Sequence, residues 1–187
     1  SLEDCKIPML TTKKMFARGV IEELLFFIRG EIDTKKLEAK GVNIWKGNTS
    51  REFLDKRGLH YLPEGNMGKG YGYQWKRFGE TDVVNNFTYD SDDHTIAGTD
   101  QLANVINLLK TDPTSRRILV SAWNPNELHE IALPPCHILY QFYVGGKDLN
   151  ELSCQFIMRT IDTFLGFPFN VLSYALLTHI IAQTVGM

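Results

Sequence analysis

The chain has 187 residues, of which 43% are hydrophobic and 22% are charged, and both values are ordinary for a globular domain. Its 20 Lys and Arg residues nearly balance its 22 Asp and Glu residues, so the formal net charge is −2. This balance excludes a general electrostatic attraction to nucleic acid or to membranes. A phosphate-bearing small molecule stays open as a ligand, because binding it needs only a few well-placed arginines.

Three cysteines, Cys5, Cys136 and Cys154, form no CxxC pair and lack the spacing of a zinc site. This odd number argues against a disulfide framework and favours a reducing compartment with one reactive thiol. No basic and apolar leader opens the chain, so we expect no signal peptide and a cytoplasmic location, with nuclear or organellar pools left open. The most apolar stretch, residues 169–185, is interrupted by polar side chains and predicts a core helix rather than a membrane span.

The first half of the chain predicts helices separated by a long polar stretch. Apolar side chains recur at helical spacing over residues 17–30, and a shorter helix is predicted over residues 34–40. Residues 47–98 are polar and contain many glycines, so we interpret them as loops with short helices, a kind of segment that often carries function. Within that stretch, residues 67–72 resemble a phosphate-binding loop but lack its full spacing, and we interpret them as a turn.

The second half predicts a helix, three strands and a buried helix. Apolar periodicity indicates an amphipathic helix over about residues 100–112. Runs of β-branched and apolar residues then predict strands over residues 117–123, 138–144 and 152–159. Side chains of the last strand alternate between two faces, and glycines before it indicate a hairpin. A buried helix follows from about Phe169. We predict one α+β domain in which a mixed β-sheet packs against helices.

A cysteine preceded by two prolines forms the first candidate site. In the segment from Leu133 to His137, Pro134 and Pro135 restrict the backbone just before Cys136, and a strand follows. A thiol held at a strand edge is a suitable nucleophile if a cationic group lowers its pKa. The other interpretation is a small buried apolar residue, which describes most free cysteines. The segment alone does not decide between the two.

Four further residues have a functional and a structural interpretation. Arg116 and Arg117 precede a strand, where consecutive side chains point to opposite faces, and they suit either phosphate binding or a solvated strand end. Asn170 begins an apolar helix, so spacing alone favours a helix cap, although its amide also matches the edge of a uracil ring. Glu23 lies on an apolar helix as either a tuned acid–base group or a polar boundary residue.

Ten motifs taken together resemble the thymidylate synthase family, in the order and spacing of that family. They occupy residues 8–13, 23–28, 43–45, 71–75, 115–118, 121–124, 133–137, 141–144, 162–170 and 173–177. The resemblance covers essentially all 187 residues and implies a methyltransferase of nucleotide biosynthesis that converts dUMP to dTMP. It further implies a homodimer formed through the sheet, 5,10-methylenetetrahydrofolate as co-substrate, dihydrofolate as product and no metal. Residues 1–187 would be one domain, incomplete at both ends.

The resemblance also implies roles for particular residues. Cys136 would add to carbon 6 of the uracil ring, Glu23 would run a proton network, and Asp162 and Arg159 would complete the catalytic group. The implied substrate-binding residues are Arg116, Arg117, Arg159, Thr160, Asp162, Asn170, His137 and Tyr71, with the first two reaching across from the partner subunit. The implied folate-binding residues are Ile44, Trp45, Asn48, Asp162, Leu165, Gly166 and Phe169.

Several residues depart from the family pattern, and two alternatives stay open, the second of them supported only by the missing termini. Met158 stands where a glutamine is usual, Lys46 where an aspartate is common, and Lys69-Gly70 where Pro-Val is usual. The change at Met158 motivates a dUMP hydroxymethylase of the same superfamily as an alternative, with water rather than hydride capturing the intermediate. The second alternative is a non-catalytic homologue that binds nucleotide or RNA.

Overall fold

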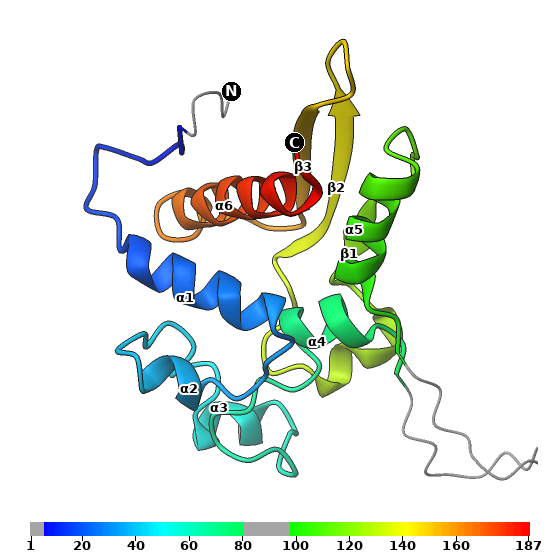
Figure 1. Ribbon diagram of the computed structural model, residues 1–187. Coiled ribbons are helices and arrows are strands. Elements are labelled where there is room, and N and C mark those ends of the chain that lie inside the picture. The colour runs from blue at the N-terminus through cyan, green and yellow to red at the C-terminus, as the bar shows by residue number, and fades with distance from the viewer. Residues whose placement is uncertain (1–5, 81–97) are drawn as a thin grey trace, which may run out of the picture.

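The structure is a computed structural model that describes residues 6–80 and 98–187. Cys5 and residues 81–97 of the predicted loop region lie outside these residues. The elements in chain order are α1 (Ala17–Ile28), α2 (Lys35–Glu38), α3 (Arg51–Lys56), α4 (Tyr71–Arg77), α5 (Gln101–Thr111), β1 (Leu119–Ser121), the 3-10 helix η2 (Pro125–Glu130), β2 (His137–Gly145), β3 (Glu151–Met158) and α6 (Phe167–Val185). The predicted α+β class is confirmed (Figure 1).

A side-chain cap marks the start of α5, whereas α6 begins without one. The Asp100 side chain accepts a hydrogen bond from the Ala103 N–H at 2.9 Å and caps α5. Helix α6 begins earlier than predicted, at Phe167, and Gly166 is its N-cap residue. Asn170 therefore lies inside the helix, and the helix-cap interpretation of this residue is wrong. Its side chain is free of a capping role because the chain enters the helix one turn earlier.

The sheet has the order β1-β2-β3, and both of its strand pairs are antiparallel. The mixed sheet expected from the sequence is therefore not found among the described residues. The connection between β2 and β3 is a tight turn through Gly146, which has φ +78°, and such a short connection permits only antiparallel pairing. Strand β1 has three residues, because only residues 119–121 pair with β2.

The two faces of the sheet differ in burial. The core face carries side chains paired across the strands, namely Val120, Tyr140, Phe142, Val144, Cys154 and Phe156. The opposite face exposes Leu119, Gln141, Tyr143, Gln155 and Ile157. This confirms the predicted alternation along β3. Tyr143, with 71% of its surface exposed, and Ile157, which lies opposite Leu139 further along the sheet, are both exposed on the outer face.

Helices cover the core face of the sheet. Helix α6 packs on β3, α5 packs on β1, and α1 lies between α6 and α4 (Figure 1). Trp75 of α4 is buried and meets Tyr140 of β2 edge to face, with ring centroids 5.0 Å apart. Among the described residues, none of the helices combines the length and apolar composition needed to cross a bilayer. The packing brings the start of α4 and the end of α1 beneath the chain that leads into β2.

Candidate active site

Cys136 lies immediately before β2, and hydrogen bonds from two directions hold its backbone. Its N–H donates to the Tyr71 hydroxyl at 2.7 Å, and its carbonyl accepts from the Arg159 N–H at 2.9 Å. The thiol-bearing side chain is half-buried. Helix α4 and the end of β3 thus fix the position of a cysteine that stays accessible, which favours the nucleophile interpretation over that of a core residue.

His137 points into the protein behind this cysteine. Its ring stacks on Tyr71 with centroids 4.1 Å apart, and its Nδ1 is hydrogen-bonded to the Tyr174 hydroxyl at 2.7 Å. Burial lowers the pKa of His137 to about 3, so the imidazole is neutral at neutral pH. His137 therefore supplies no positive charge beside the cysteine.

Arg159 provides a positive charge at the edge of the cysteine segment. Its Nε donates to the Pro135 carbonyl at 2.8 Å, and its Nη2 donates to the Pro134 carbonyl at 3.1 Å. The guanidinium lies 5.6 Å from the centroid of the Trp123 ring. The Arg159 side chain is exposed, and its Nη1 bonds no described residue. One edge of the guanidinium can therefore bind an anion. Thr160 is exposed beside it.

A cavity of about 230 Å³ collects six of the predicted site residues. Its lining comes from α1, the segment around residue 44 and the start of α6. The lining residues are Phe16, Gly19, Val20, Glu23, Ile44, Leu165, Gly166, Phe169 and Asn170. Five of these are large and apolar, whereas Glu23 and Asn170 contribute polar groups. This combination of apolar walls with two polar groups suits a flat heteroaromatic ligand.

Glu23 is the titratable group of this cavity. Burial raises its pKa to about 7, and the hydrogen bond that Trp45 Nε1 donates to Oε1 at 2.7 Å acts in the opposite direction. Its carboxyl forms no ion pair with a described residue. A carboxyl that titrates near neutral pH can both accept and donate a proton there, so the acid–base interpretation is favoured over the boundary interpretation.

Asp162 and Asn170 lie on either side of the start of α6. Asp162 Oδ1 accepts from the Leu165 N–H at 2.7 Å and the Phe164 N–H at 3.0 Å, and the first of these bonds lowers the pKa of Asp162. Its role in the structure is to shape the loop before α6. The Asn170 Nδ2 lies 3.8 Å from the Met158 Sδ, and a thioether is only a weak acceptor.

Three of the predicted site residues contact neither the cysteine segment nor the cavity. Arg116 and Arg117 are exposed just before β1, and neither guanidinium bonds another described residue. Asn48 is half-buried and does not line the cavity. Trp45 contributes through its bond to Glu23 rather than through the cavity wall. Within residues 6–80 and 98–187, no three His, Cys, Asp or Glu side chains are close enough together to hold a metal ion.

Some residues of the site are not indicated as such by local sequence patterns. Val20 lines the cavity one helical step before Glu23, and the i, i+3 spacing on one helix face would have indicated it. Tyr174 was part of a recognised motif, but no local pattern indicates its bond to His137. Lys69 and its partner Glu127 form a buried polar network, and no sequence signal predicts a contact between segments so far apart.

Comparison with known proteins places this geometry in a family. The family model described as thymidylate synthase matches residues 1–187. The chain belongs to the thymidylate synthase family. It is 50% identical to the thymidylate synthase of Ascaris suum over 187 residues, which cover 100% of this chain and 61% of that protein. It is 49% identical to the thymidylate synthase of Saccharomyces cerevisiae, covering 100% of this chain and 62% of that protein.

The thymidylate synthase family also includes fused proteins among the relatives of this chain. The chain is 49% identical to the bifunctional dihydrofolate reductase-thymidylate synthase of Leishmania major, covering 100% of this chain and 35% of that protein. The chain thus spans less than two thirds of the length of each of these relatives. The resemblance found in the ten sequence motifs is confirmed at the level of the family.

Proposed function

We propose that the protein is a thymidylate synthase that methylates dUMP to dTMP, within one domain that includes residues 1–187. The observation that carries the proposal is a chain of contacts from the nucleophile to the cavity. Tyr71 bonds the backbone of Cys136 and meets Trp45 edge to face, with ring centroids 6.1 Å apart. Trp45 in turn bonds Glu23. A positioned thiol and a carboxyl that titrates near pH 7 thereby belong to one connected site.

The chemistry requires a carbon nucleophile at a ring position that has no acidic proton. Addition of the Cys136 thiolate to carbon 6 of uracil makes carbon 5 nucleophilic, and later elimination of the thiol restores the ring. Arg159 would hold the substrate phosphate, because its guanidinium is exposed and hydrogen-bonded to the cysteine segment. Glu23 is suited to move protons at the pyrimidine oxygen.

The cavity beside Glu23 fits the folate co-substrate in chemical character. Its apolar walls include Ile44, Leu165 and Phe169, and these would pack on a pterin ring and exclude water. When bound, 5,10-methylenetetrahydrofolate supplies the one-carbon unit and the hydride. Asp162 lies at the loop between this cavity and α6, where it orders the backbone at Leu165 and Gly166.

Identification of the nucleotide product tests the proposal. The full-length protein is incubated with dUMP and 5,10-methylenetetrahydrofolate, and the products are identified by mass spectrometry. We expect dTMP together with dihydrofolate. The specific observation that favours the hydroxymethylase alternative is Met158, whose thioether replaces a stronger polar group beside Asn170. Appearance of 5-hydroxymethyl-dUMP with tetrahydrofolate would establish that alternative, and the absence of any product would favour the non-catalytic homologue.

Replacement of Asn170 by aspartate is expected to shift the base preference from dUMP towards dCMP. A protonated carboxyl presents a donor and an acceptor that match the cytosine edge, whereas the asparagine amide matches uracil. We expect the ratio of kcat/KM for dUMP over dCMP to fall by roughly 100-fold, the size of discrimination that a lost pair of matched polar contacts produces. Leu165→Ala is the matched control, because it alters the same cavity without touching base recognition. An unchanged ratio in Asn170→Asp would remove this residue from recognition.

A homodimer is expected to form through the outer face of the sheet. Tyr143 and Ile157 expose apolar surface there, and the exposed Arg116 and Arg117 precede the strand at its edge. We expect Tyr143→Lys to weaken dimerisation by roughly 100-fold in Kd, because burying an unpaired ammonium is unfavourable. Sedimentation equilibrium measures the effect, with the exposed Tyr61→Lys as control. A monomeric wild-type protein that binds dUMP normally would contradict the assignment of the two arginines to the partner's site.

A further inference from the structure

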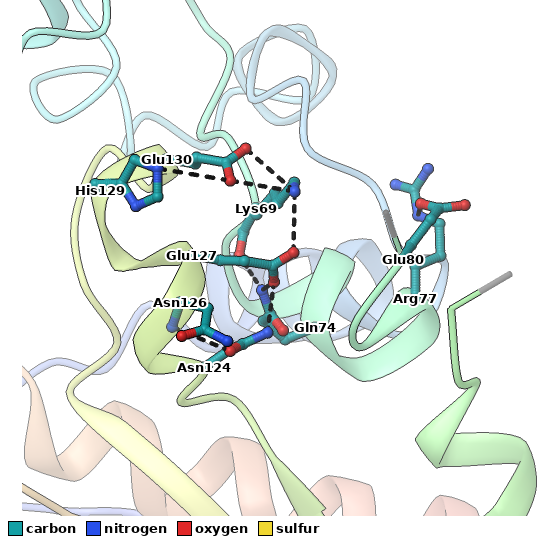
Figure 2. A network of polar contacts seen from close by, with 9 residues as sticks. All are labelled: Lys69, Gln74, Arg77, Glu80, Asn124, Asn126, Glu127, His129 and Glu130. Atoms are coloured by element: carbon teal, nitrogen blue, oxygen red, sulfur yellow. Dashed lines mark hydrogen bonds and ion pairs between the residues drawn. The ribbon is translucent and has the colours of Figure 1, made fainter. Parts of the chain in front are cut away.

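Lys69 lies just before α4 in a position that is mostly shielded from solvent. Its ammonium contacts Glu127 Oε1 at 2.9 Å and Glu130 Oε2 at 3.1 Å, and 23% of its side chain is exposed (Figure 2). Both acids belong to η2. Desolvation by burial acts to lower the pKa of Lys69, but the hydrogen bonds to the two carboxylates outweigh it and raise that pKa above its ordinary value. The residue is therefore a permanent cation between α4 and η2.

Glu127 is the centre of this network. Only 8% of its side chain is exposed, and its second oxygen accepts from Gln74 Nε2 and from Asn124 Nδ2, each at 2.8 Å (Figure 2). Gln74 also donates to the Lys69 carbonyl at 2.9 Å. A buried carboxylate is stable when both of its oxygens accept hydrogen bonds from nearby donors. Removal of one partner leaves a buried charge that is not compensated. The donors come from both sides, so the network ties α4 to η2.

Backbone contacts bring the same two segments together. The Ala132 N–H donates to the Met67 carbonyl at 3.1 Å, and Gly68 forms an antiparallel bridge with Ile131. Gly68 has φ +67°, and a Cβ added there would lie 1.9 Å from the Glu130 carbonyl oxygen. Only glycine permits this approach. The stretch from residue 67 to 69 is therefore held directly against the stretch that leads to the nucleophile.

Both segments continue at once into the candidate active site. Tyr71 follows Lys69 by two residues, Cys136 follows Ala132 by four, and the Tyr71 hydroxyl accepts the hydrogen bond from the Cys136 N–H. We propose that Lys69 is a positioning residue, whose contacts with Glu127 and Glu130 set the placement of Tyr71 against the Cys136 backbone. The part of this inference that concerns turnover rests on the proposed function, whereas the part that concerns the Tyr71–Cys136 bond does not.

Lys76 provides a matched control for a purely structural effect. It lies on α4, which begins two residues after Lys69, and its ammonium pairs with Asp100, the N-cap residue of α5. Its side chain is 31% exposed, which is similar to the exposure of Lys69. Lys76→Met therefore removes an ion pair of comparable burial that joins α4 to a different element. Lys69→Arg keeps the positive charge and tests rescue by a conservative change.

The test uses the full-length protein and three variants, Lys69→Met, Lys69→Arg and Lys76→Met, at a temperature where circular dichroism shows each of them folded. Amide hydrogen exchange of Cys136 reports the bond to Tyr71 without any substrate. For Lys69→Met we expect this exchange to be roughly tenfold faster, because the local opening becomes easier. We also expect kcat for dTMP formation to be roughly tenfold lower with KM for dUMP changed less than about twofold, since misplacement of the nucleophile acts on the chemical step.

The outcomes of this experiment are distinct. For Lys69→Arg we expect the Cys136 exchange rate and kcat to stay within about threefold of wild type. For Lys76→Met we expect both the exchange rate and kcat to be unchanged. Equal Cys136 exchange in Lys69→Met and Lys76→Met would overturn the positioning role and leave Lys69 as a stabilising residue only. If the wild-type protein forms no dTMP, the proposed function fails, and the exchange measurement still decides whether Lys69 positions the Cys136 backbone.

Discussion

Replacement of Cys136 by serine is expected to lower kcat for dTMP formation by at least about 1,000-fold, as removal of a covalent nucleophile does in other enzymes. The hydroxyl is almost isosteric with the thiol, so the bonds of the Cys136 backbone to Tyr71 and Arg159 should persist. A hydroxyl does not ionise near neutral pH, even beside a guanidinium. His137 is a weak base here, because burial lowers its pKa to about 3, and its Nδ1 is hydrogen-bonded to the Tyr174 hydroxyl.

Cys154 provides the internal control for this prediction. It is half-buried on the core face of β3, and burial raises the pKa of its thiol to about 11, so it stays protonated. Initial rates and the mass of the intact protein with bound dUMP would be measured for Cys136→Ser and Cys154→Ala. We expect Cys154→Ala to keep kcat within about twofold of wild type. Comparable activity in wild type and Cys136→Ser would exclude the covalent mechanism.

The free energy of unfolding is expected to fall as the pH rises from about 5 to about 8, through the titration of Glu23. The folded-state pKa of Glu23 is raised to about 7 by burial, above its ordinary value of 4.5. Between these values the folded protein keeps a proton that the unfolded chain releases. This contribution to stability is therefore complete below pH 4.5 and is lost as the pH passes 7. Its size is about 2–3 kcal/mol.

Urea denaturation at pH 5 and pH 8 measures the free energy of unfolding at each pH and so tests the prediction on Glu23. The Glu23→Gln variant should lose the decline, because its amide keeps the Trp45 bond and does not titrate. Glu22→Gln is the control on the adjacent position. The pKa of Glu22 is lowered by its hydrogen bond to Lys40, so Glu22 changes the pH dependence of the free energy of unfolding with the opposite sign. The Glu22→Gln variant should therefore still lose stability between pH 5 and pH 8. Identical pH slopes in Glu23→Gln and wild type would show that Glu23 is ionised throughout the range.

Local patterns determined much of the secondary structure. The helical spacing of apolar residues located α1, and strict alternation located both faces of β3, because each element buries one side against the core. The Pro134-Pro135-Cys136 segment likewise indicates a candidate nucleophile from its sequence alone. The family resemblance then joined distant motifs that no single pattern would have joined, and the family comparison confirmed it.

Tertiary structure decided the rest, because burial and long-range pairing are not properties of a local segment. Spacing suggested a cap at Asn170, but the start of α6 at Phe167 placed this residue inside the helix, facing Met158. The shift of the Glu23 pKa follows from the elements packed around it. The network of Lys69 and Glu127 joins residues 58 positions apart. Sequence determined which groups could react, and packing decided which of them meet, since desolvation and contact both depend on the folded neighbours.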